Sequence, residues 1–207
     1  MDRFFPYFIR EGKVNKLDNC AYGERIRARI QGKKALSKLY NEFYSRYSDC
    51  IKKCPEKGLV LEIGSGAGLI KDAIPNVVTT DILAYETVDL VMDAAEFPFC
   101  DNSLRSIFLL NTLHHLPDSK AFFSEVVRCL MPGGRVLIID QYHGWFSKII
   151  YTYLHHESYE PGAVNWNFKT SGPLSGANGA LCWIIFYRDR HLFEKNCPFH
   201  SNLFLRA

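Results

Sequence analysis

The sequence predicts an α/β fold in which a mostly parallel sheet is covered by helices on both faces. Short apolar runs of strand length alternate with helical patterns over the middle of the 207-residue chain. A glycine-rich turn follows the first of these runs, and a Pro-Gly-Gly turn precedes the last. Because a crossover separates each strand from the next, we expect parallel strands that are buried on both sides.

The composition is that of a globular protein, since 47% of the 207 residues are hydrophobic, which is enough for the core of one domain. The seven cysteines are scattered and form no paired CxxC units, so neither a zinc ribbon nor a disulfide framework is indicated. No run approaches the roughly 18 apolar residues of a membrane span, and no signal-peptide pattern opens the chain. We therefore expect a soluble protein of the reducing cytoplasm.

Residues 1–57 are expected to form a helical N-terminal extension, because apolar residues recur at helical spacing over residues 24–54 and stop at Cys54-Pro55. This part of the chain is basic. Residues 1–60 contain 14 Lys and Arg against 7 Asp and Glu, whereas the rest contains 11 against 15. Such a surface either attracts phosphates or an anionic surface, or is simply the solvated face of a helix, and the spacing favours the second interpretation.

Residues 58–140 are expected to form the core of the fold. Five apolar runs predict its strands, and the amphipathic pattern over residues 118–130 predicts the helix before the last of them. A second helix is expected to open directly after the glycine turn. The predicted strands are residues 59–63, 77–81, 88–92, 106–110 and 135–139, and the second helix is residues 67–73.

The last third of the chain has a weaker pattern. Residues 141–180 are rich in aromatic residues and glycine and are expected to form a lid or substrate insertion after the fifth strand, with an amphipathic stretch over residues 145–154. That stretch either packs on the domain, which is the more usual case, or rests on a membrane surface. Residues 181–207 are expected to form terminal strands and a helix, with the first strand over residues 181–186 and the helix over residues 190–196. The end at Ala207 predicts a short last strand or an exposed sheet edge.

The turn after the first strand contains Gly64, Gly66 and Gly68 in the pattern GxGxG. Glycine tolerates positive φ and lets the backbone approach a ligand closely. A dinucleotide fingerprint would need a third glycine at Leu69, and a phosphate-binding Walker loop would need a GK[ST] that is absent. Taken alone, the pattern is also compatible with a tight turn that has no ligand.

Acidic residues follow successive predicted strands, and they strengthen the interpretation of the glycine turn as part of a ligand site. Asp81 ends the second strand, where a carboxylate can accept both hydroxyls of a ribose. Asp93 ends the third, where it can accept an amino group while Ala94 faces a base. Either acid alone could instead cap the next helix. Together with Glu62 before the turn, they describe a nucleoside site.

The ordered motifs "LEIGSGAG", "TTD", "MDAAEFPF", "NTLHHLPD" and "PGGRVLIID" resemble the class I S-adenosylmethionine-dependent methyltransferases, and within them the type 11 branch. The resemblance covers residues 59–140. It implies the Rossmann-like fold of that class and S-adenosylmethionine as cofactor, with S-adenosylhomocysteine as product. Two departures are a crossover between Asp81 and Asp93 that is too short for a helix, and Arg105 where the family often has Asp.

The resemblance also implies which residues hold the cofactor. The three glycines would lie along its methionine part, with Glu62 anchoring the turn; Asp81 would bind the ribose, Asp93 and Ala94 the adenine, and Asn111 would lie near the methionine amino group. The full set of expected cofactor residues is Glu62, Gly64, Ser65, Gly66, Gly68, Asp81, Ile82, Asp93, Ala94 and Asn111.

The methyl acceptor is expected to be a small molecule or a glycan, free or lipid-linked, that is methylated on a hydroxyl. His114 and His115 follow the fourth strand and are the candidate bases, although one of them could cap the next turn while only the other faces the site. We expect no metal, because the run from His155 to Glu157 forms no recognisable ligand set. A nucleic-acid substrate is disfavoured, since the [DN]PP[YFW] motif of amino-group methylation is absent.

Two other functions stay open from the sequence. One is a cofactor-binding regulatory or partner subunit without catalysis, which Arg105 and the early chain end suggest. The other is a nicotinamide-dependent oxidoreductase, which the glycine pattern disfavours.

Overall fold

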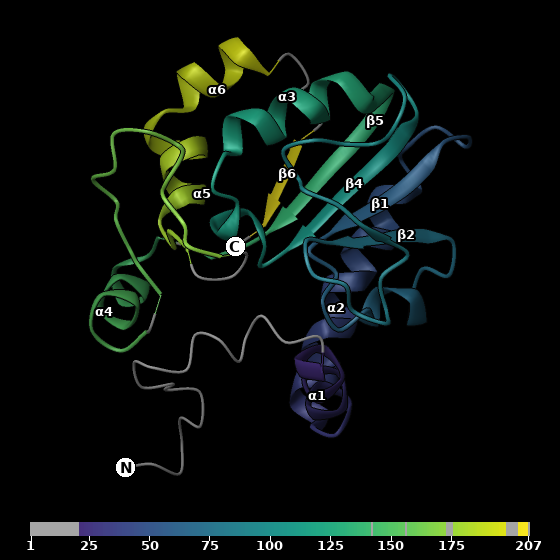
Figure 1. Cartoon of the computed structure of the whole chain (residues 1–207), viewed down its shortest axis with the longest axis horizontal. Helices are drawn as coiled ribbons and strands as arrows, with labels where there is room; N and C mark the ends of the chain where they lie inside the picture. Colours follow the sequence, from purple (N-terminus) through teal and green to yellow (C-terminus); the bar gives the residue numbers. More distant parts are fainter. Residues whose placement is uncertain (1–20, 142, 156, 173–175, 198–202, 207) are drawn as a thin grey trace.

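The computed structural model of the chain describes residues 21–141, 143–155, 157–172, 176–197 and 203–206. Within them lies a six-stranded sheet in the order β3-β2-β1-β4-β5-β6, in which all neighbours are parallel (Figure 1). This is the order of a Rossmann-like doubly wound sheet, and it confirms the predicted fold class. The strands are β1 (Leu59–Ile63), β2 (Val77–Asp81), β3 (Leu90–Val91), β4 (Leu104–Leu110), β5 (Leu130–Ile139) and β6 (Leu203–Arg206).

Helices cover both faces of this sheet, as the sequence predicts (Figure 1). The two N-terminal helices, α1 (Ala21–Gln31) and α2 (Lys34–Ile51), lie on one face, and α3 (Ser119–Cys129), α5 (Leu181–Trp183) and α6 (Arg190–Asn196) lie on the other. Residues 1–20 of the expected N-terminal extension lie outside the described residues. The expected division of the chain at residues 58, 141 and 181 stays a prediction.

The face under α2 has a core of its own. The ring of Tyr47 is fully buried and stacks on Phe108 of β4, with ring centroids 4.2 Å apart and the planes 4° from parallel. Tyr44 packs beside it at helical spacing, which explains why the apolar pattern over residues 24–54 is helical. Burying two aromatic rings against the central strands anchors α2, and α2 in turn supports α1 beside the strand ends.

The opposite face is covered by α3, whose N-terminus is capped by Asp118, since its carboxylate accepts the backbone N–H of Ala121 at 3.0 Å. Phe122 and Val126, four residues apart, are fully buried against the sheet. At the foot of the sheet, the guanidinium of Arg105 donates to the backbone carbonyl oxygen of Glu56 at 3.0 Å. Arg105 therefore fixes the loop before β1.

The expected strand over residues 181–186 is wrong, because this stretch is helical. It forms α5 and then a π-helical turn, η4 (Ile184–Arg188), in which the Asp189 N–H donates to the Ile184 carbonyl. Leu181, Ile184 and Ile185 are all buried. A helix that is apolar on all sides shows no amphipathic period, so it cannot be told from a buried strand by pattern alone.

Two predicted elements are shorter than expected. The helix over residues 67–73 is only a 3₁₀ turn, η2 (Leu69–Asp72), because the left-handed Gly68 delays its start and Pro75 follows closely. The strand over residues 88–92 shrinks to the two residues of β3. The link from Asp81 to β3 is a loop, as the short spacing predicts.

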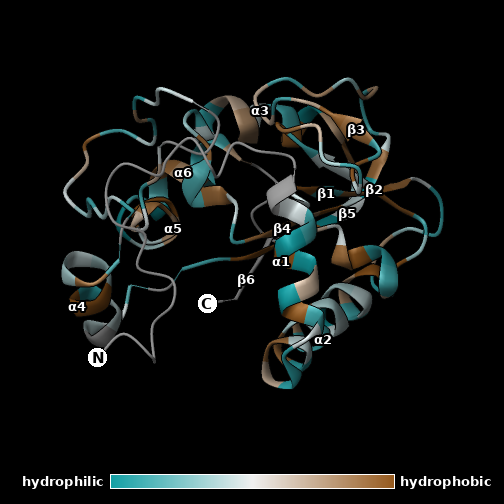
Figure 2. Cartoon of the chain, turned by 60° about the horizontal axis from the view of Figure 1, so that its bottom comes forward, coloured by the Kyte–Doolittle hydropathy of each residue, from teal (hydrophilic) through white to brown (hydrophobic). Residues whose placement is uncertain are grey.

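The helix α4 (Trp145–Tyr153) stands apart from the sheet in both views (Figures 1 and 2). It confirms the helical pattern over residues 145–154 but not the packed face that we considered more usual. Trp145 and Tyr153 are 79% and 78% exposed, and Ile149 between them is 47% exposed. In the described ranges, no helix combines the length and apolar character that crossing a membrane requires.

Candidate functional site

A cavity of about 450 Å³ opens at the carboxyl ends of the strands. Ligands of open parallel sheets bind in this position, and the volume lies in the range of about 300–1,000 Å³ typical of small-molecule sites. Its lining brings the glycine turn together with the ends of β2, β3 and β4. The lining residues are Gly23, Ile26, Ile63, Gly64, Gly66, Ala67, Thr80, Asp81, Ile82, Tyr85, Met92, Asp93, Ala94, Asn111, Thr112, His115, Leu116, Pro117, Thr170 and Gly172.

The glycine turn needs its glycines for different reasons. Gly64, Gly66 and Gly68 all have positive φ, of 69°, 46° and 62°. A Cβ on Gly64 would lie 2.4 Å from Thr112 Oγ1, and one on Gly68 would lie 2.5 Å from Thr87 Cβ, so both positions are closed by the protein itself. A Cβ on Gly66 would meet no protein atom within 4 Å. Since Gly66 lines the cavity, its backbone faces the site without a protein atom covering it.

Asp81 holds the turn to the second strand. Its Oδ2 accepts the Gly66 N–H at 3.0 Å, and its Oδ1 accepts the Leu83 N–H at 3.0 Å. Burial raises the pKa of Asp81, although these backbone N–H groups act in the opposite direction. Each carboxylate oxygen keeps a second lone pair for a ligand in the cavity.

The other expected residues at the strand ends also line the cavity. Asp93 is exposed and accepts the Ala95 N–H at 2.8 Å, while Ala94 beside it is buried. Asn111 has a φ of +51°, which Asn tolerates better than most residues, and its N–H donates to Ile139 O at 2.8 Å. This left-handed residue ends β4 and turns the chain past the cavity. Ile82, after β2, lines it as well.

Glu62, which precedes the turn, and Ser65 and Gly68 within the turn are absent from the cavity lining. The Ser65 hydroxyl donates to the Glu62 carbonyl at 3.3 Å and accepts the Thr80 N–H at 3.2 Å, which ties the turn to β2. Burial raises the pKa of Glu62 to about 8. Its Oε2 is buried without a hydrogen-bond partner in the described structure. The backbone carbonyl of Glu62 thus contacts the turn, while its carboxyl group lies inside the protein.

Helix α1 closes one side of the cavity, and this contribution was not predicted. Gly23 faces the ring of Tyr85, and Ile26 lines the cavity. Arg27 donates to the Gly68 carbonyl at 3.0 Å and pairs with Asp72 at 2.8 Å. We expected the basic residues of the N-terminal helices to form a solvated face, and Arg27 departs from that expectation.

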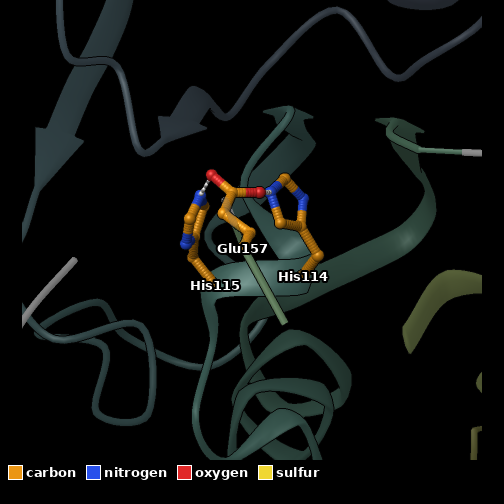
Figure 3. A group of neighbouring side chains, drawn as sticks. All are labelled: His114, His115 and Glu157. Carbon is orange, nitrogen blue, oxygen red and sulfur yellow. Dashed lines mark ion pairs between the residues drawn. The ribbon is translucent and has the colours of Figure 1, made fainter. Parts of the chain in front are cut away.

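The two histidines have different surroundings. His115 lines the cavity, whereas His114 is 2% exposed and is absent from the lining. Of the two arrangements left open by the sequence, the structure has the one in which only one imidazole faces the site. His114 Nδ1 lies 2.5 Å from Asp140 Oδ1, and His115 Nδ1 donates to Gly176 O at 3.2 Å. Glu157 lies between the two rings (Figure 3).

The charges of this group are strongly coupled. Burial opposes the charge of His114, but Asp140 and Glu157 outweigh it and raise the pKa of His114 to about 10. Burial also disfavours the ionised form of Glu157, yet His114 lowers the pKa of Glu157 to about 2. For His115, burial and the neighbouring His114 charge lower the pKa. The group therefore places a charged imidazole and two carboxylates behind a neutral imidazole.

Sequence reasoning missed Asp140 and Thr170, and it considered Glu157 only together with its sequence neighbour His155. Asp140 ends the fifth strand, which is the same signal that singled out Asp81, so it could have been found. Glu157 and Thr170 belong to the irregular 141–180 segment, whose path no periodicity predicts. Thr170 and Gly172 show that this segment contributes to the cavity wall.

A family model described as "Methyltransferase domain" matches residues 61–138. Among curated proteins, the chain is similar to phosphoethanolamine N-methyltransferase 2 of Caenorhabditis elegans, with 40% identity over 48 residues, or 23% of this chain and 11% of that protein. It is 34% identical over 61 residues to the chloroplastic tocopherol O-methyltransferase of Arabidopsis thaliana, or 30% of this chain and 18% of that protein. The matched segment thus spans less than a fifth of either relative's length.

Among solved structures, the chain is similar to a Methanococcus maripaludis protein assigned as an S-adenosyl-L-methionine-dependent methyltransferase. The TM-score is 0.48 and the identity 13%, and the match covers 66% of this chain and 73% of that one.

Proposed function

Since residues 61–138 are a methyltransferase domain of the class I, S-adenosylmethionine-dependent family, type 11 branch, we propose that this chain transfers a methyl group from S-adenosylmethionine to a hydroxyl of a small molecule. The observation that supports this most is the cavity at the strand ends, whose lining joins the bare Gly66 backbone, the Asp81 carboxylate and His115. One compartment therefore combines features suited to a nucleoside cofactor with an imidazole where an acceptor would enter.

The cofactor would lie along the strand ends. Its ribose hydroxyls would donate to Asp81, whose oxygens are already oriented by two backbone N–H groups. Its adenine would lie between Ile82 and Ala94, within reach of Asp93. The methionine part would follow Gly64 and Gly66 toward Asn111. Glu62, Ser65 and Gly68 would support this arrangement without contact, since they lie behind the lining.

The acceptor would meet the methyl group beside His115. Transfer from a sulfonium needs an in-line approach and exclusion of water rather than covalent help. Leu116 and Pro117 provide an apolar wall next to His115, and Thr170 adds a hydroxyl for orientation. His114, expected as a second candidate base, would not reach the acceptor, because its ring is enclosed by Asp140, Gln141 and Glu157.

Small molecules are the acceptor class that the relatives favour, since one is named for methylation of tocopherol and the other of phosphoethanolamine. A glycan or lipid-linked sugar is a narrower proposal. The exposed apolar face of α4, with Trp145 and Tyr153, supports peripheral membrane contact during access to such a lipid. Binding of the chain to anionic phospholipid vesicles, lost in Trp145→Ser, would test this; equal binding would dismiss it.

Two alternatives remain to be tested against this function. A non-catalytic cofactor-binding subunit loses part of its motivation, because Arg105 fixes the loop before β1 and lies outside the cavity lining. A nicotinamide-dependent oxidoreductase would need a third glycine at the position of Leu69, where the first helix packs closely on the strand.

The six cysteines among the described residues are all free thiols, which supports a reducing, cytoplasmic compartment.

The test is transfer of a labelled methyl group from S-adenosylmethionine by the full 207-residue chain to a panel of hydroxylated small molecules and glycans. We expect transfer to at least one hydroxyl acceptor, and much less in a folded Asp81→Asn variant. Saturable cofactor binding without transfer to any acceptor would instead favour the non-catalytic subunit. Transfer to amines alone would contradict the hydroxyl assignment.

A further inference from the structure

Two imidazole nitrogens and a carboxylate converge beside the cavity, from parts of the chain that lie far apart in sequence. His114 and His115 end the 3₁₀ turn η3 (Leu113–His115), which follows β4, and Glu157 lies beyond α4. One donor atom from each lies within 4.8 Å of the others. Figure 3 shows the Glu157 carboxylate between the two rings.

Each imidazole has its second nitrogen occupied. Asp140 Oδ1 lies 2.5 Å from His114 Nδ1, and Gly176 O lies 3.2 Å from His115 Nδ1. A carboxylate and a carbonyl can only accept, so both Nδ1 atoms donate, and the Nε2 atoms are the ones turned toward Glu157. Histidines that bind a metal almost always donate their other ring N–H to a carboxylate or a backbone carbonyl. This pair has one partner of each kind.

The distances within the group fit an ion better than a direct hydrogen bond. His114 Nε2 lies 3.4 Å from Glu157 Oε2, and His115 Nε2 lies 3.5 Å from Glu157 Oε1. A charge-assisted N–H···O bond is shorter, at about 2.7–2.9 Å. Ligand atoms bound tetrahedrally at about 2.1 Å from a zinc ion lie about 3.4 Å apart. Each imidazole nitrogen thus lies as far from one oxygen of Glu157 as two ligand atoms of one tetrahedral ion lie from each other.

Burial and charge agree with this spacing. The side chains of His114 and Asp140 are 3% and 1% exposed, and those of His115 and Glu157 are 21% and 20% exposed. The carboxylates of Asp140 and Glu157 balance the charge of a divalent ion, which would take the place of the proton on His114 Nε2. The amide nitrogen of Gln141 lies 3.2 Å from His114 Nε2 and donates to Glu157 Oε2 at 3.2 Å, so Gln141 holds the Glu157 carboxylate beside the two rings.

We propose that His114, His115 and Glu157 bind one divalent transition-metal ion of the zinc class at the cavity wall. Imidazole and carboxylate ligands suit such an ion, and three protein ligands leave one position for a water or a substrate oxygen. His115 is the ligand that lines the cavity, so the ion lies on the side of the acceptor. This replaces our expectation of no metal, which considered only ligands adjacent in sequence.

The role of the ion rests on the proposed methyl transfer. An acceptor hydroxyl bound to the ion loses its proton to water more readily than a free one. Its oxygen then forms the bond to the methyl carbon while the carbon–sulfur bond breaks, and that electron pair stays on sulfur as S-adenosylhomocysteine forms. His115 would act here as a ligand.

The test is metal binding by the full chain after removal of metal with a chelator. We would titrate it with Zn²⁺ by calorimetry and with Co²⁺ by visible absorption, which reports the coordination geometry directly. We expect one equivalent of each, and at least tenfold weaker binding in Glu157→Gln. Glu160→Gln, an exposed glutamate three residues away, is the matched control and should bind like the original chain. His115→Asn serves the same comparison if Glu157→Gln does not fold.

Folded chain that binds neither ion, or binds both equally in Glu157→Gln, would overturn the metal site. A parallel titration with S-adenosylhomocysteine separates the two proposals. Binding of S-adenosylhomocysteine without metal overturns only the metal site, whereas metal binding without S-adenosylhomocysteine supports the site and contradicts the proposed function.

Discussion

The substitution Gly66→Ala distinguishes a turn that holds a ligand from one that is only tight. An added Cβ at Gly66 would meet no protein atom within 4 Å, and the residue lines the cavity. The new methyl group would therefore occupy space that, in our account, belongs to the cofactor. The expected effect falls mainly on binding and only modestly on folding.

The cost in stability can be worked from the backbone. Gly66 has a φ of +46°, and the left-handed conformation costs a residue with a Cβ about 1–2 kcal/mol. For a domain of this size, that corresponds to a fall in Tm of about 2–8 °C. Because the backbone must approach the cofactor closely, we expect affinity for S-adenosylhomocysteine to fall at least about tenfold, or about 1.4 kcal/mol.

Gly68→Ala is the matched control, since it pays the same conformational cost two residues away. Its Cβ would lie 2.5 Å from Thr87 Cβ, so the turn must also shift, which adds about 1–3 kcal/mol. We expect Gly68→Ala to lower Tm more than Gly66→Ala. Thermal unfolding and calorimetric titration with S-adenosylhomocysteine measure both effects. A Gly66→Ala variant that binds as tightly as the original chain would refute contact between the cofactor and this turn.

Three further substitutions test the surroundings of the turn. Asp81→Asn leaves one backbone N–H facing an amide NH₂, so we expect about 1–3 kcal/mol lower stability and at least about tenfold weaker binding of S-adenosylhomocysteine. Asp101→Asn, at an exposed carboxylate, is the control and should change neither quantity. Equal effects of the two substitutions would contradict the site. Burial raises the pKa of Glu62 in the folded state to about 8, above its ordinary value of 4.5. The native state therefore binds more protons than the unfolded state, and its stability falls by up to about 5 kcal/mol as the pH rises from about 5 to 8. Urea unfolding of Glu62→Gln should show a flatter dependence in that window, and an unchanged slope would dismiss the assignment. Arg27→Ala should speed amide exchange in α1 and in the turn, because the Gly68 carbonyl loses the Arg27 donor and Asp72 loses its ion pair with Arg27. Unchanged exchange would show that α1 is held without Arg27.

The cofactor side of the site could be predicted because its signals are local. Each expected residue at a strand end follows a short apolar run directly, and parallel strands bring their carboxyl ends to one edge of the sheet. As this rule predicts, one cavity is lined by Gly66, Asp81, Asp93 and Asn111. Their roles as cofactor ligands stay a prediction until binding is measured.

The acceptor side could not be predicted, because it depends on contacts between distant segments. Glu157 reaches His114 only after the chain has passed through α4, and no periodicity reveals that path. The arrangement of α1 over the turn depends likewise on Arg27, which in sequence is one basic residue among many. The helical residues 181–186 were misassigned because a fully buried helix and a buried strand share the same apolar pattern.

The most direct test of the account is calorimetric titration of the purified 207-residue chain with S-adenosylhomocysteine, with a nicotinamide dinucleotide in a parallel titration. We predict saturable binding of one equivalent of S-adenosylhomocysteine, weakened in Gly66→Ala, and no binding of the dinucleotide. A folded chain that binds no S-adenosylhomocysteine, or that binds the dinucleotide instead, would contradict the assignment of this cavity to a methyl donor.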